Sequence, residues 1–206
     1  MATAQPTASS RWTTKKILTI GVIGLLVALL VAVAVGLGAS KSVTGSGMRP
    51  TLQSGDRVLG DTSAYAGRSP GRFDVVGLHA PGLKGVTIRR VVGVPGDRVQ
   101  IRAVGGQPQV LLQPAGRGAW QIVTQHRHVD WGSSPGACCA PNGAATAGDT
   151  QTVPPGKYFV LGDNPTASDD SRNFGFVDRS AITGRVSFRI WPPGRVGGRP
   201  QLVPLR

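Results

Sequence analysis

Several residue classes are scarce in this 206-residue chain, and each shortage excludes a class of protein. Two cysteines cannot form a disulfide-dense secreted scaffold. Glutamate is absent, so all 10 acidic residues are aspartates. The sequence contains no phosphate-binding glycine loop, no helix-turn-helix pattern and no aromatic stacking platform. We therefore expect no cofactor and no nucleic-acid partner.

Glycine and proline, in contrast, are abundant, with 30 and 16 residues. This content excludes a helical bundle or coiled coil, and the lack of a Gly-X-Y period excludes collagen. The net charge of +13 suits contact with anionic lipid or wall polymer better than with nucleic acid, because no nucleic-acid motif accompanies it. The composition therefore predicts short strands joined by turns.

One long apolar run, Ile17–Ala39, contains no charged residue. As a helix it would be about 34 Å long, enough to span the hydrocarbon core of a membrane. A cleaved signal peptide is the alternative, but its apolar core usually lasts only about 7–15 residues. Arg11, Lys15 and Lys16 precede the run, and such positive charge stays on the cytoplasmic side. We therefore predict a cytoplasmic N-terminus 1–16, a transmembrane anchor 17–39 and a single-pass plasma-membrane protein whose C-terminal domain is extracytoplasmic.

The rest of the chain shows short β-branched runs bounded by glycine, proline and aspartate. These runs are Arg57–Leu59, Asp74–Leu78, Val86–Val92, Val99–Ile101, Lys157–Leu161 and Gly184–Ile190. They predict a mainly β domain over 40–192, folded as a curled sheet or partly open barrel. Gly105–Gly148 is rich in glycine, alanine and proline and is interpreted as an inserted hairpin with mobile loops. The segment 193–206 is predicted to be a basic, poorly ordered tail.

Three segments carry candidate chemistry. Thr44–Leu52 (TGSGMRPTL) offers hydroxyl groups on a small-residue loop, Ile88–Asp97 is a basic strand ending in a tight turn, and Gly162–Gly175 is a polar loop. In the last segment Asp170 and Arg172 stand two residues apart, so on an extended chain they face the same side and can pair. Taken singly, the three segments are equally consistent with a linker, a surface strand and a solvated loop.

Taken together, the three segments resemble those of the type I signal peptidases, membrane-anchored serine proteases that remove signal peptides from exported proteins. That family carries Ser-x-Ser-Met-x-Pro-Thr-Leu, then Lys-Arg-x-x-Gly-x-Pro-Gly-Asp, then Gly-Asp-Asn followed by Ser-x-Asp-Ser-Arg-x-x-Gly. The order, spacing and membrane topology agree from Ile17 to Pro192. The resemblance implies a β-sheet fold, a serine–lysine catalytic dyad and a cleft for an extended peptide with small residues at two alternate positions.

The resemblance also assigns supporting roles by position. Ser168 would orient the lysine, and Asp170 and Arg172 would form a supporting salt bridge. Met48 and Pro50 would belong to the substrate cleft.

The two dyad positions depart from the family pattern. The nucleophilic serine of that pattern falls on Gly47, the general-base lysine on Arg89, and the serine that helps to stabilise the oxyanion on Gly45. Glycine carries no nucleophile. Arginine, with a pKa above about 12, is not a neutral base near pH 7, whereas a buried lysine can be. The chain therefore keeps the scaffold and the support residues while both halves of the dyad are replaced.

Ser46 is the alternative nucleophile, with Thr44 as the oxyanion helper, if Gly47 is counted as an inserted residue. A one-residue slip turns a side chain to the opposite face, so this register needs a bulge. The sequence supplies no matching base, since Lys84 lies near a predicted turn and His79 lies on another strand. We expect little residual proteolysis even in this register.

Two further features are weaker. Cys138 and Cys139 form a vicinal pair in which a disulfide would be strained, and two metal ligands alone do not make a zinc site. His126 and His128 are interpreted as residues of a surface hairpin rather than a metal pair. We therefore predict no metal site.

The leading hypothesis is a catalytically impaired or inactive signal-peptidase-like protein that binds the signal-peptide region of exported preproteins. Its other expected partners are membrane lipid and an active signal peptidase or the secretion machinery. The first alternative is an active serine endopeptidase that uses Ser46. The second alternative is a membrane-tethered, non-enzymatic β module that contacts the wall or another membrane protein.

Overall fold

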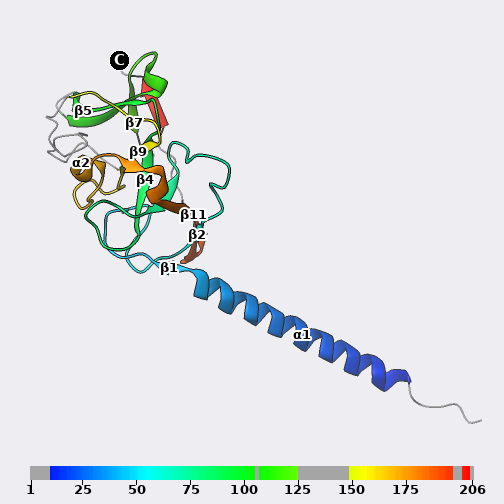
Figure 1. Ribbon diagram of the computed structural model, residues 1–206. Helices are drawn as coiled ribbons and strands as arrows, with labels where there is room; N and C mark the ends of the chain where they lie inside the picture. Colours follow the sequence, from blue (N-terminus) through cyan, green and yellow to red (C-terminus); the bar gives the residue numbers. More distant parts are fainter. Residues whose placement is uncertain (1–9, 105–106, 125–148, 197–200, 205–206) are drawn as a thin grey trace, which may run out of the picture. The chain divides into compact units, whose positions relative to one another are not determined.

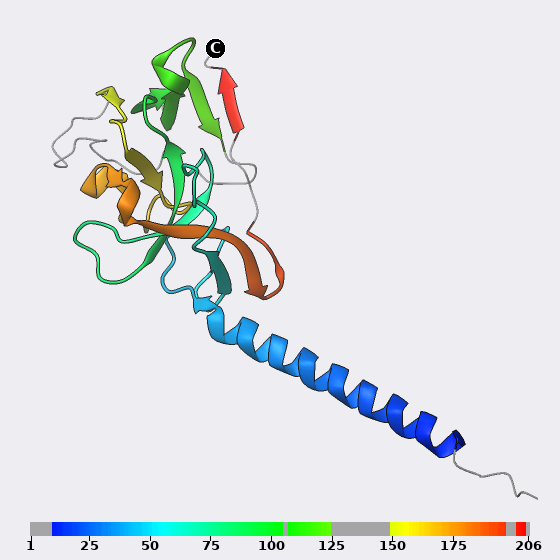
Figure 2. The same cartoon turned by 45° about the vertical axis from the view of Figure 1, so that its right-hand side comes forward.

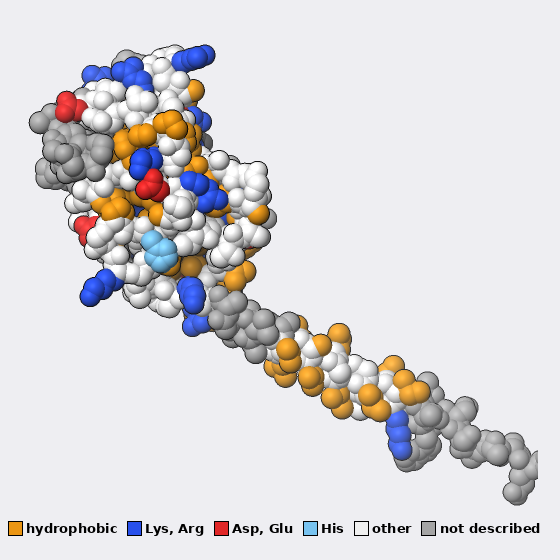
Figure 3. Space-filling model, viewed as in Figure 1, with side chains coloured by type: hydrophobic (Ala, Val, Ile, Leu, Met, Phe, Trp, Pro, Cys, Tyr) orange, Lys and Arg blue, Asp and Glu red, His pale blue; other side chains and the backbone are white. Residues whose placement is uncertain are grey.

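The structure is a computed structural model that describes residues 10–104, 107–124, 149–196 and 201–204. The chain divides into two compact units, Met1–Ser40 and Lys41–Arg206. The first unit contains the helix α1 (Ser10–Ala39), drawn in blue in Figure 1. Apolar side chains cover the visible side of its described part, and Ile17, Leu18 and Leu30 are exposed (Figure 3).

Among the residues that the structure describes, no helix meets both the length and the apolarity needed to cross a membrane. The anchor over 17–39 stays a prediction.

The second unit contains two antiparallel sheets (Figures 1 and 2). The eight-stranded sheet has the order β1-β2-β11-β3-β4-β9-β10, with β12 paired to β11. Its strands are β1 (Lys41–Ser42), β2 (Arg57–Asp61), β3 (Val75–Leu78), β4 (Thr87–Gly93), β9 (Lys157–Leu161), β10 (Val177–Asp178), β11 (Ile182–Trp191) and β12 (Gly194–Arg195).

The five-stranded sheet has the order β13-β7-β6-β5-β8. Its strands are β5 (Arg98–Val104), β6 (Gln107–Gln113), β7 (Gln121–Thr124), β8 (Gln151–Thr152) and β13 (Gln201–Pro204). The short helix α2 (Ser171–Phe174) and the 3₁₀ turns η1 (Pro114–Gly116) and η3 (Arg179–Ala181) complete the described elements.

The strand β11 curls the larger sheet. It pairs with β2 on one edge and with β3 on the other. Its register against β2 shifts between Val186 and Phe188 and again between Arg189 and Trp191. Such irregularities bend a strand and increase its twist, and β11 curves across the sheet in Figure 2. The curled, mainly β fold predicted from the sequence is therefore confirmed.

Buried apolar side chains hold the unit together in three clusters. One cluster joins the two sheets, with Val92 and Phe159 from the larger sheet packed with Val99 and Leu112 from the smaller. A second lies around Val76, Leu78, Tyr158 and Val160. The third fastens the segment after β1 to the sheet through Val43, Met48, Leu52, Val58, Val75 and Val186. This third cluster positions the site described below.

The six predicted β runs form β2, β3, β4, β5, β9 and β11. Gly105–Gly148 contributes β6 and β7, while 125–148 lies outside the described residues. The prediction of a poorly ordered tail over 193–206 is wrong for its described strands, because β12 pairs with β11 and β13 pairs with β7. These short strands depend on partners that lie far away in the sequence, so local composition did not reveal them.

Candidate functional site

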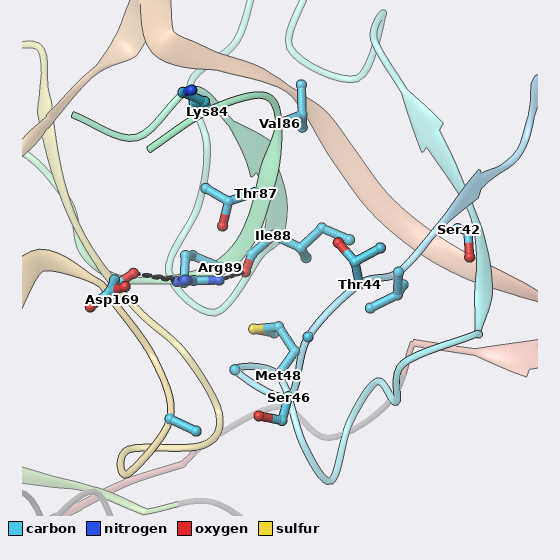
Figure 4. Close-up of a pocket in the computed structure, with 14 residues that line it drawn as sticks. Ser42, Thr44, Ser46, Met48, Lys84, Val86, Thr87, Ile88, Arg89 and Asp169 are labelled. Carbon is cyan, nitrogen blue, oxygen red and sulfur yellow. Dashed lines mark hydrogen bonds between the residues drawn. The ribbon is translucent and has the colours of Figure 1, made fainter. Parts of the chain in front are cut away.

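A cleft of about 250 Å³ opens between two segments of the second unit (Figure 4). One wall follows β1 and the other leads into β4. The lining residues are Ser42, Val43, Thr44, Gly45, Ser46, Gly47, Met48, Lys84, Val86, Thr87, Ile88, Arg89, Ala167 and Asp169. The cleft therefore brings together parts of all three segments that the sequence analysis singled out.

The first wall is held by backbone hydrogen bonds and by buried side chains. The Val43 N–H donates to the Asp56 carbonyl at 2.8 Å, and the Gly55 N–H donates to the Val43 carbonyl at 2.9 Å. Val43 and Met48 are buried in the core. The four residues between them, 44–47, are left half-buried or exposed along the cleft.

The loop between β9 and α2 is tied to this wall. The Asn164 N–H donates to the Gly47 carbonyl at 2.9 Å, and the Asn164 side-chain amide donates to the Ser46 carbonyl at 3.0 Å. Gly162 permits this approach, because a Cβ there would collide with the Ser168 hydroxyl and lie 2.5 Å from the Gly47 carbonyl oxygen. A side chain at Gly162 would therefore separate the loop from the wall.

The second wall has an unpaired edge. The strand β4 pairs with β3 from Thr87 to Arg90, but with β9 only from Arg90 to Gly93. On that second edge Thr87–Arg89 has no partner strand among the described residues. An open strand edge offers N–H and C=O groups to an extended peptide.

Gly47 and Arg89 face each other across the cleft. A Cβ built on Gly47 would lie 3.5 Å from Arg89 Nη1, 3.2 Å from the Ala167 carbonyl oxygen and 3.6 Å from Ser168 Cα. Gly47 is not among the glycines with positive φ, so its backbone conformation is open to any L-residue. A side chain at position 47 would therefore reach the group at position 89.

The guanidinium of Arg89 is fixed by backbone carbonyls. Its Nε and Nη2 donate to the Asp169 carbonyl at 2.9 and 2.7 Å, and its Nη1 donates to the Ile88 carbonyl at 2.6 Å (Figure 4). Burial lowers the pKa of Arg89, and the charges of Asp170 and then Asp169 partly offset this effect. Because arginine stays protonated in proteins, position 89 presents a permanent cation to the cleft.

The hydroxyl of Ser168 lies next to this pair of residues. It is buried and has no hydrogen-bond partner among the described residues. An unsatisfied buried hydroxyl costs about 1–3 kcal/mol, so it marks a place where another group is expected to complete the site. The resemblance had assigned Ser168 to orient a lysine amine, and the guanidinium of Arg89 does not take up that hydrogen bond.

Asp170 and Arg172 form a buried ion pair at the start of α2. Arg172 Nε donates to Asp170 Oδ1 at 2.8 Å and Arg172 Nη2 donates to Asp170 Oδ2 at 2.8 Å. Asp170 also accepts from the Gly162 N–H at 2.9 Å and caps the helix through the Arg172 N–H. The sequence argument placed the two residues on an extended segment. That geometry is wrong, because the capping aspartate begins a helical turn there.

Sequence reasoning missed a second buried pair that links all three segments. Arg90 Nε and Nη2 donate to the Asp163 carboxylate at 2.8 and 2.6 Å, and the Thr51 hydroxyl donates to the same carboxylate at 2.5 Å. Arg90 and Asp163 are fully buried. The sequence held one clue to this pair: Thr51, Arg90 and Asp163 each lie in a different one of the three motif segments.

Ser46 and Thr44 line the same cleft, but neither takes part in the close approach between position 47 and Arg89. In Figure 4 the Ser46 hydroxyl lies away from Arg89, beyond the Met48 side chain, and Lys84 lies on the opposite side of the cleft. The Lys84 amine and the Ser46 hydroxyl therefore do not meet. His79 is exposed and is not one of the lining residues.

The remaining predicted site residues also differ in whether they line the cleft. Met48 lines the cleft, whereas Pro50 is exposed and is not one of the lining residues. No cluster of three or more His, Cys, Asp or Glu that could hold a metal ion occurs among the described residues. The remaining candidate ligands, His126, His128, Cys138 and Cys139, lie outside the described residues.

Residues 15–191 match the family model described as signal peptidase, peptidase S26. The chain is 30% identical over 203 residues to the signal peptidase I of Leptolyngbya laminosa, covering 94% of this chain and 89% of that protein. It is 33% identical over 184 residues to the signal peptidase IB of Staphylococcus aureus strain Mu50, covering 86% of this chain and 92% of that protein. A crystal structure of a signal peptidase I from Enterococcus faecalis V583 is 25% identical, with a TM-score of 0.39, and the match covers 57% of this chain and 97% of that one.

Proposed function

Because this chain belongs to the signal peptidase family, peptidase S26, we propose that it binds the signal-peptide region of exported preproteins and hydrolyses it poorly or not at all. One observation carries the proposal. Gly47 and Arg89 lie side by side in the cleft, where the family resemblance places a serine nucleophile and a lysine base. The cleft itself is formed, and Asp170 and Arg172 form a buried ion pair.

The chemistry of these two residues argues against hydrolysis. Acyl transfer by a serine–lysine dyad needs a hydroxyl to attack the peptide carbonyl and a neutral amine to take its proton. Gly47 has no hydroxyl, and the charged Arg89 has no lone pair with which to accept a proton. Ser46 does not replace the nucleophile, because no cleft amine lies beside its hydroxyl (Figure 4).

Peptide binding, in contrast, needs only the parts that remain. The edge of β4 at Thr87–Arg89 is open on the cleft side among the described residues, so an extended peptide can pair with it as an added strand. Alternate side chains of that peptide would point into the same wall. A cleft of about 250 Å³ has room for small side chains, which is the preference that the family resemblance implies.

We place the cleft on the outer face of the plasma membrane. The exposed apolar side chains of α1 and the basic residues Arg11, Lys15 and Lys16 before the run 17–39 support a single-pass anchor with a cytoplasmic N-terminus. The extracytoplasmic part, 40–192, would then meet preproteins as they leave the membrane. Membrane lipid and an active signal peptidase or the secretion machinery are the partners that this location offers.

The test is cleavage of a preprotein in detergent or liposomes by the chain as given and by the double variant Gly47→Ser, Arg89→Lys. We expect the given chain to be inert and the double variant to exceed it by at least about 100-fold, since base activation contributes roughly 10²–10⁴. Gly47→Ala combined with Arg89→Lys is the matched control, because it adds the Cβ and the amine without a nucleophile.

Two outcomes would contradict the proposal. Cleavage by the given chain that Ser46→Ala abolishes would make the protein an active serine endopeptidase. Failure of a translocating preprotein to crosslink to photoreactive groups placed along 84–89 would leave a membrane-tethered β module that does not bind preproteins.

A further inference from the structure

We propose that the cleft is a product site: the space between Gly47 and the Arg89 guanidinium binds the free C-terminal carboxylate of a peptide that has already been cleaved. The inference rests on the proposed function and refines its ligand, from intact preproteins to cleaved signal peptides that end in a small residue. It concerns binding alone and requires no reaction.

Space for the carboxylate comes from the missing side chain of Gly47. A Cβ at that position would be 3.5 Å from Arg89 Nη1, so an oxygen atom placed slightly beyond it lies within hydrogen-bond distance of the guanidinium. In the binding mode that the family resemblance implies, the carbonyl carbon at the cleavage point lies beside position 47. Hydrolysis adds an oxygen to that carbon, and the absent side chain leaves room for it.

Donors for the carboxylate come from Arg89. The three hydrogen bonds from Arg89 to the Ile88 and Asp169 carbonyls use three of its five N–H groups, which leaves one on Nη1 and one on Nη2. Nη1 is the nitrogen nearest to Gly47. Charge-assisted bonds of this kind are roughly twice as strong as neutral ones.

The charges around the contact leave Arg89 as the group that an anion meets. Asp170 is bound by Arg172, with both Arg172 donors at 2.8 Å, so the charge of Arg172 partly offsets the negative charge that Asp170 places near Arg89. Asp169 is exposed and weakens the positive potential at Arg89. Lys84 lines the cleft on the side away from Ser46 and is exposed. Asp169→Asn is therefore expected to tighten binding of an anionic peptide terminus.

The test compares three peptides with the full chain in detergent micelles, by fluorescence anisotropy. The first ends in Ala-x-Ala with a free carboxylate, the second is its C-terminal amide, and the third continues through the cleavage point. We expect the free acid to bind at least tenfold more tightly than either of the others, a difference of about 1.4 kcal/mol. Arg89→Gln is expected to abolish this preference. The matched control Arg102→Gln, which removes an exposed cation of β5 that does not line the cleft, is expected to retain it.

A second variant keeps the test decisive if Arg89→Gln fails to fold. Gly47→Val keeps the cation but fills the space, so it is also expected to lose the preference while its thermal unfolding remains cooperative. Equal binding of the acid and the amide would overturn the inference and leave the proposed function standing. Binding of none of the three peptides would overturn both. If the variant Lys84→Gln lost the preference while Arg89→Gln kept it, Lys84 rather than Arg89 would bind the carboxylate. That result would overturn the inference.

Discussion

At position 89, arginine and lysine differ in what they can do with a proton. A buried lysine amine loses its proton near neutral pH and then accepts another from a hydroxyl. The Arg89 guanidinium keeps its charge although burial lowers its pKa, and the Asp169 and Ile88 carbonyls fix its orientation. It can attract an anion but cannot act as a base. In the function proposed above, this residue would move the cleft from proton transfer to charge recognition.

Gly45 is a second cleft residue of interest, because its backbone conformation restricts which side chains position 45 can carry. Its φ is 82°, in the left-handed region that disfavours side chains. We predict that Gly45→Ala lowers the free energy of unfolding by about 1–2 kcal/mol, measured by urea denaturation. The same strain would apply to a serine, the residue that the family pattern has at this position.

The matched control for this prediction is Gly60→Ala in β2. Gly60 does not have a positive φ, and an added Cβ would meet nothing within 4 Å. Its free energy of unfolding is expected to stay close to that of the parent chain. Equal losses in the two variants would show that backbone strain at position 45 is not the cause.

At the scale of elements, the buried pair of Arg90 and Asp163 fastens β4 to the loop between β9 and α2. We predict that Asp163→Asn lowers the free energy of unfolding by about 3–5 kcal/mol, because it leaves the Arg90 charge buried without its partner. Thermal and urea unfolding would measure the loss.

An exposed ion pair supplies the comparison for Asp163. Lys157 and Asp178 also form an ion pair, but their side chains are 38% and 63% exposed. Asp178→Asn is therefore expected to cost less than about 1 kcal/mol. A loss at Asp163 no larger than the loss at Asp178 would contradict the role given to the buried pair.

The strands were predictable from the sequence where burial patterns are local. The run Lys157–Leu161 is a continuous stretch of strand-forming residues and has the same bounds in β9. The helix α2 was not predicted, because four residues capped by Asp170 leave no periodic pattern. The strands β12 and β13 were missed because they exist only through pairing with β11 and β7.

The candidate site shows the same division. The motifs identified Gly47 and Arg89, but only the fold shows that a Cβ built on Gly47 would lie 3.5 Å from Arg89 Nη1. The Ser168 hydroxyl, which has no partner among the described residues, lies where a Cβ on Gly162 would collide with it, and sequence spacing does not encode this close approach. The role of Arg90 was missed because the sequence does not show which of the two adjacent arginines, Arg89 or Arg90, lies in the cleft and which lies in the core.

At the scale of the whole molecule, two features can bind a membrane: an exposed apolar helix by insertion, and a basic folded unit by electrostatic attraction. The net charge is +13, and Lys and Arg side chains are spread over the visible face of the second unit (Figure 3). Electrostatic contact with anionic lipid weakens with salt, because the screening length falls to about 3 Å at 1 M. Insertion of an apolar helix does not depend on salt in this way.

We therefore predict that the full chain floats with anionic vesicles in 1 M salt. The variant Leu25→Arg, Leu26→Arg is expected to be released, because each charge at a helix centre costs about 2.5–3.5 kcal/mol on insertion. Flotation in a density gradient measures both. Release of the parent chain by salt would show that surface charge alone holds it, and the anchor over 17–39 would be wrong.

The bare Cα of Gly47 also determines how this chain answers covalent reagents. An acylating probe that modifies the serine of an active signal peptidase has no oxygen to attach to at this position. In a membrane that holds both proteins, we expect such a probe to label the active enzyme and to pass over this chain. The double variant Gly47→Ser, Arg89→Lys would become visible to the same probe, so labelling would report directly on the activated hydroxyl that the parent chain lacks.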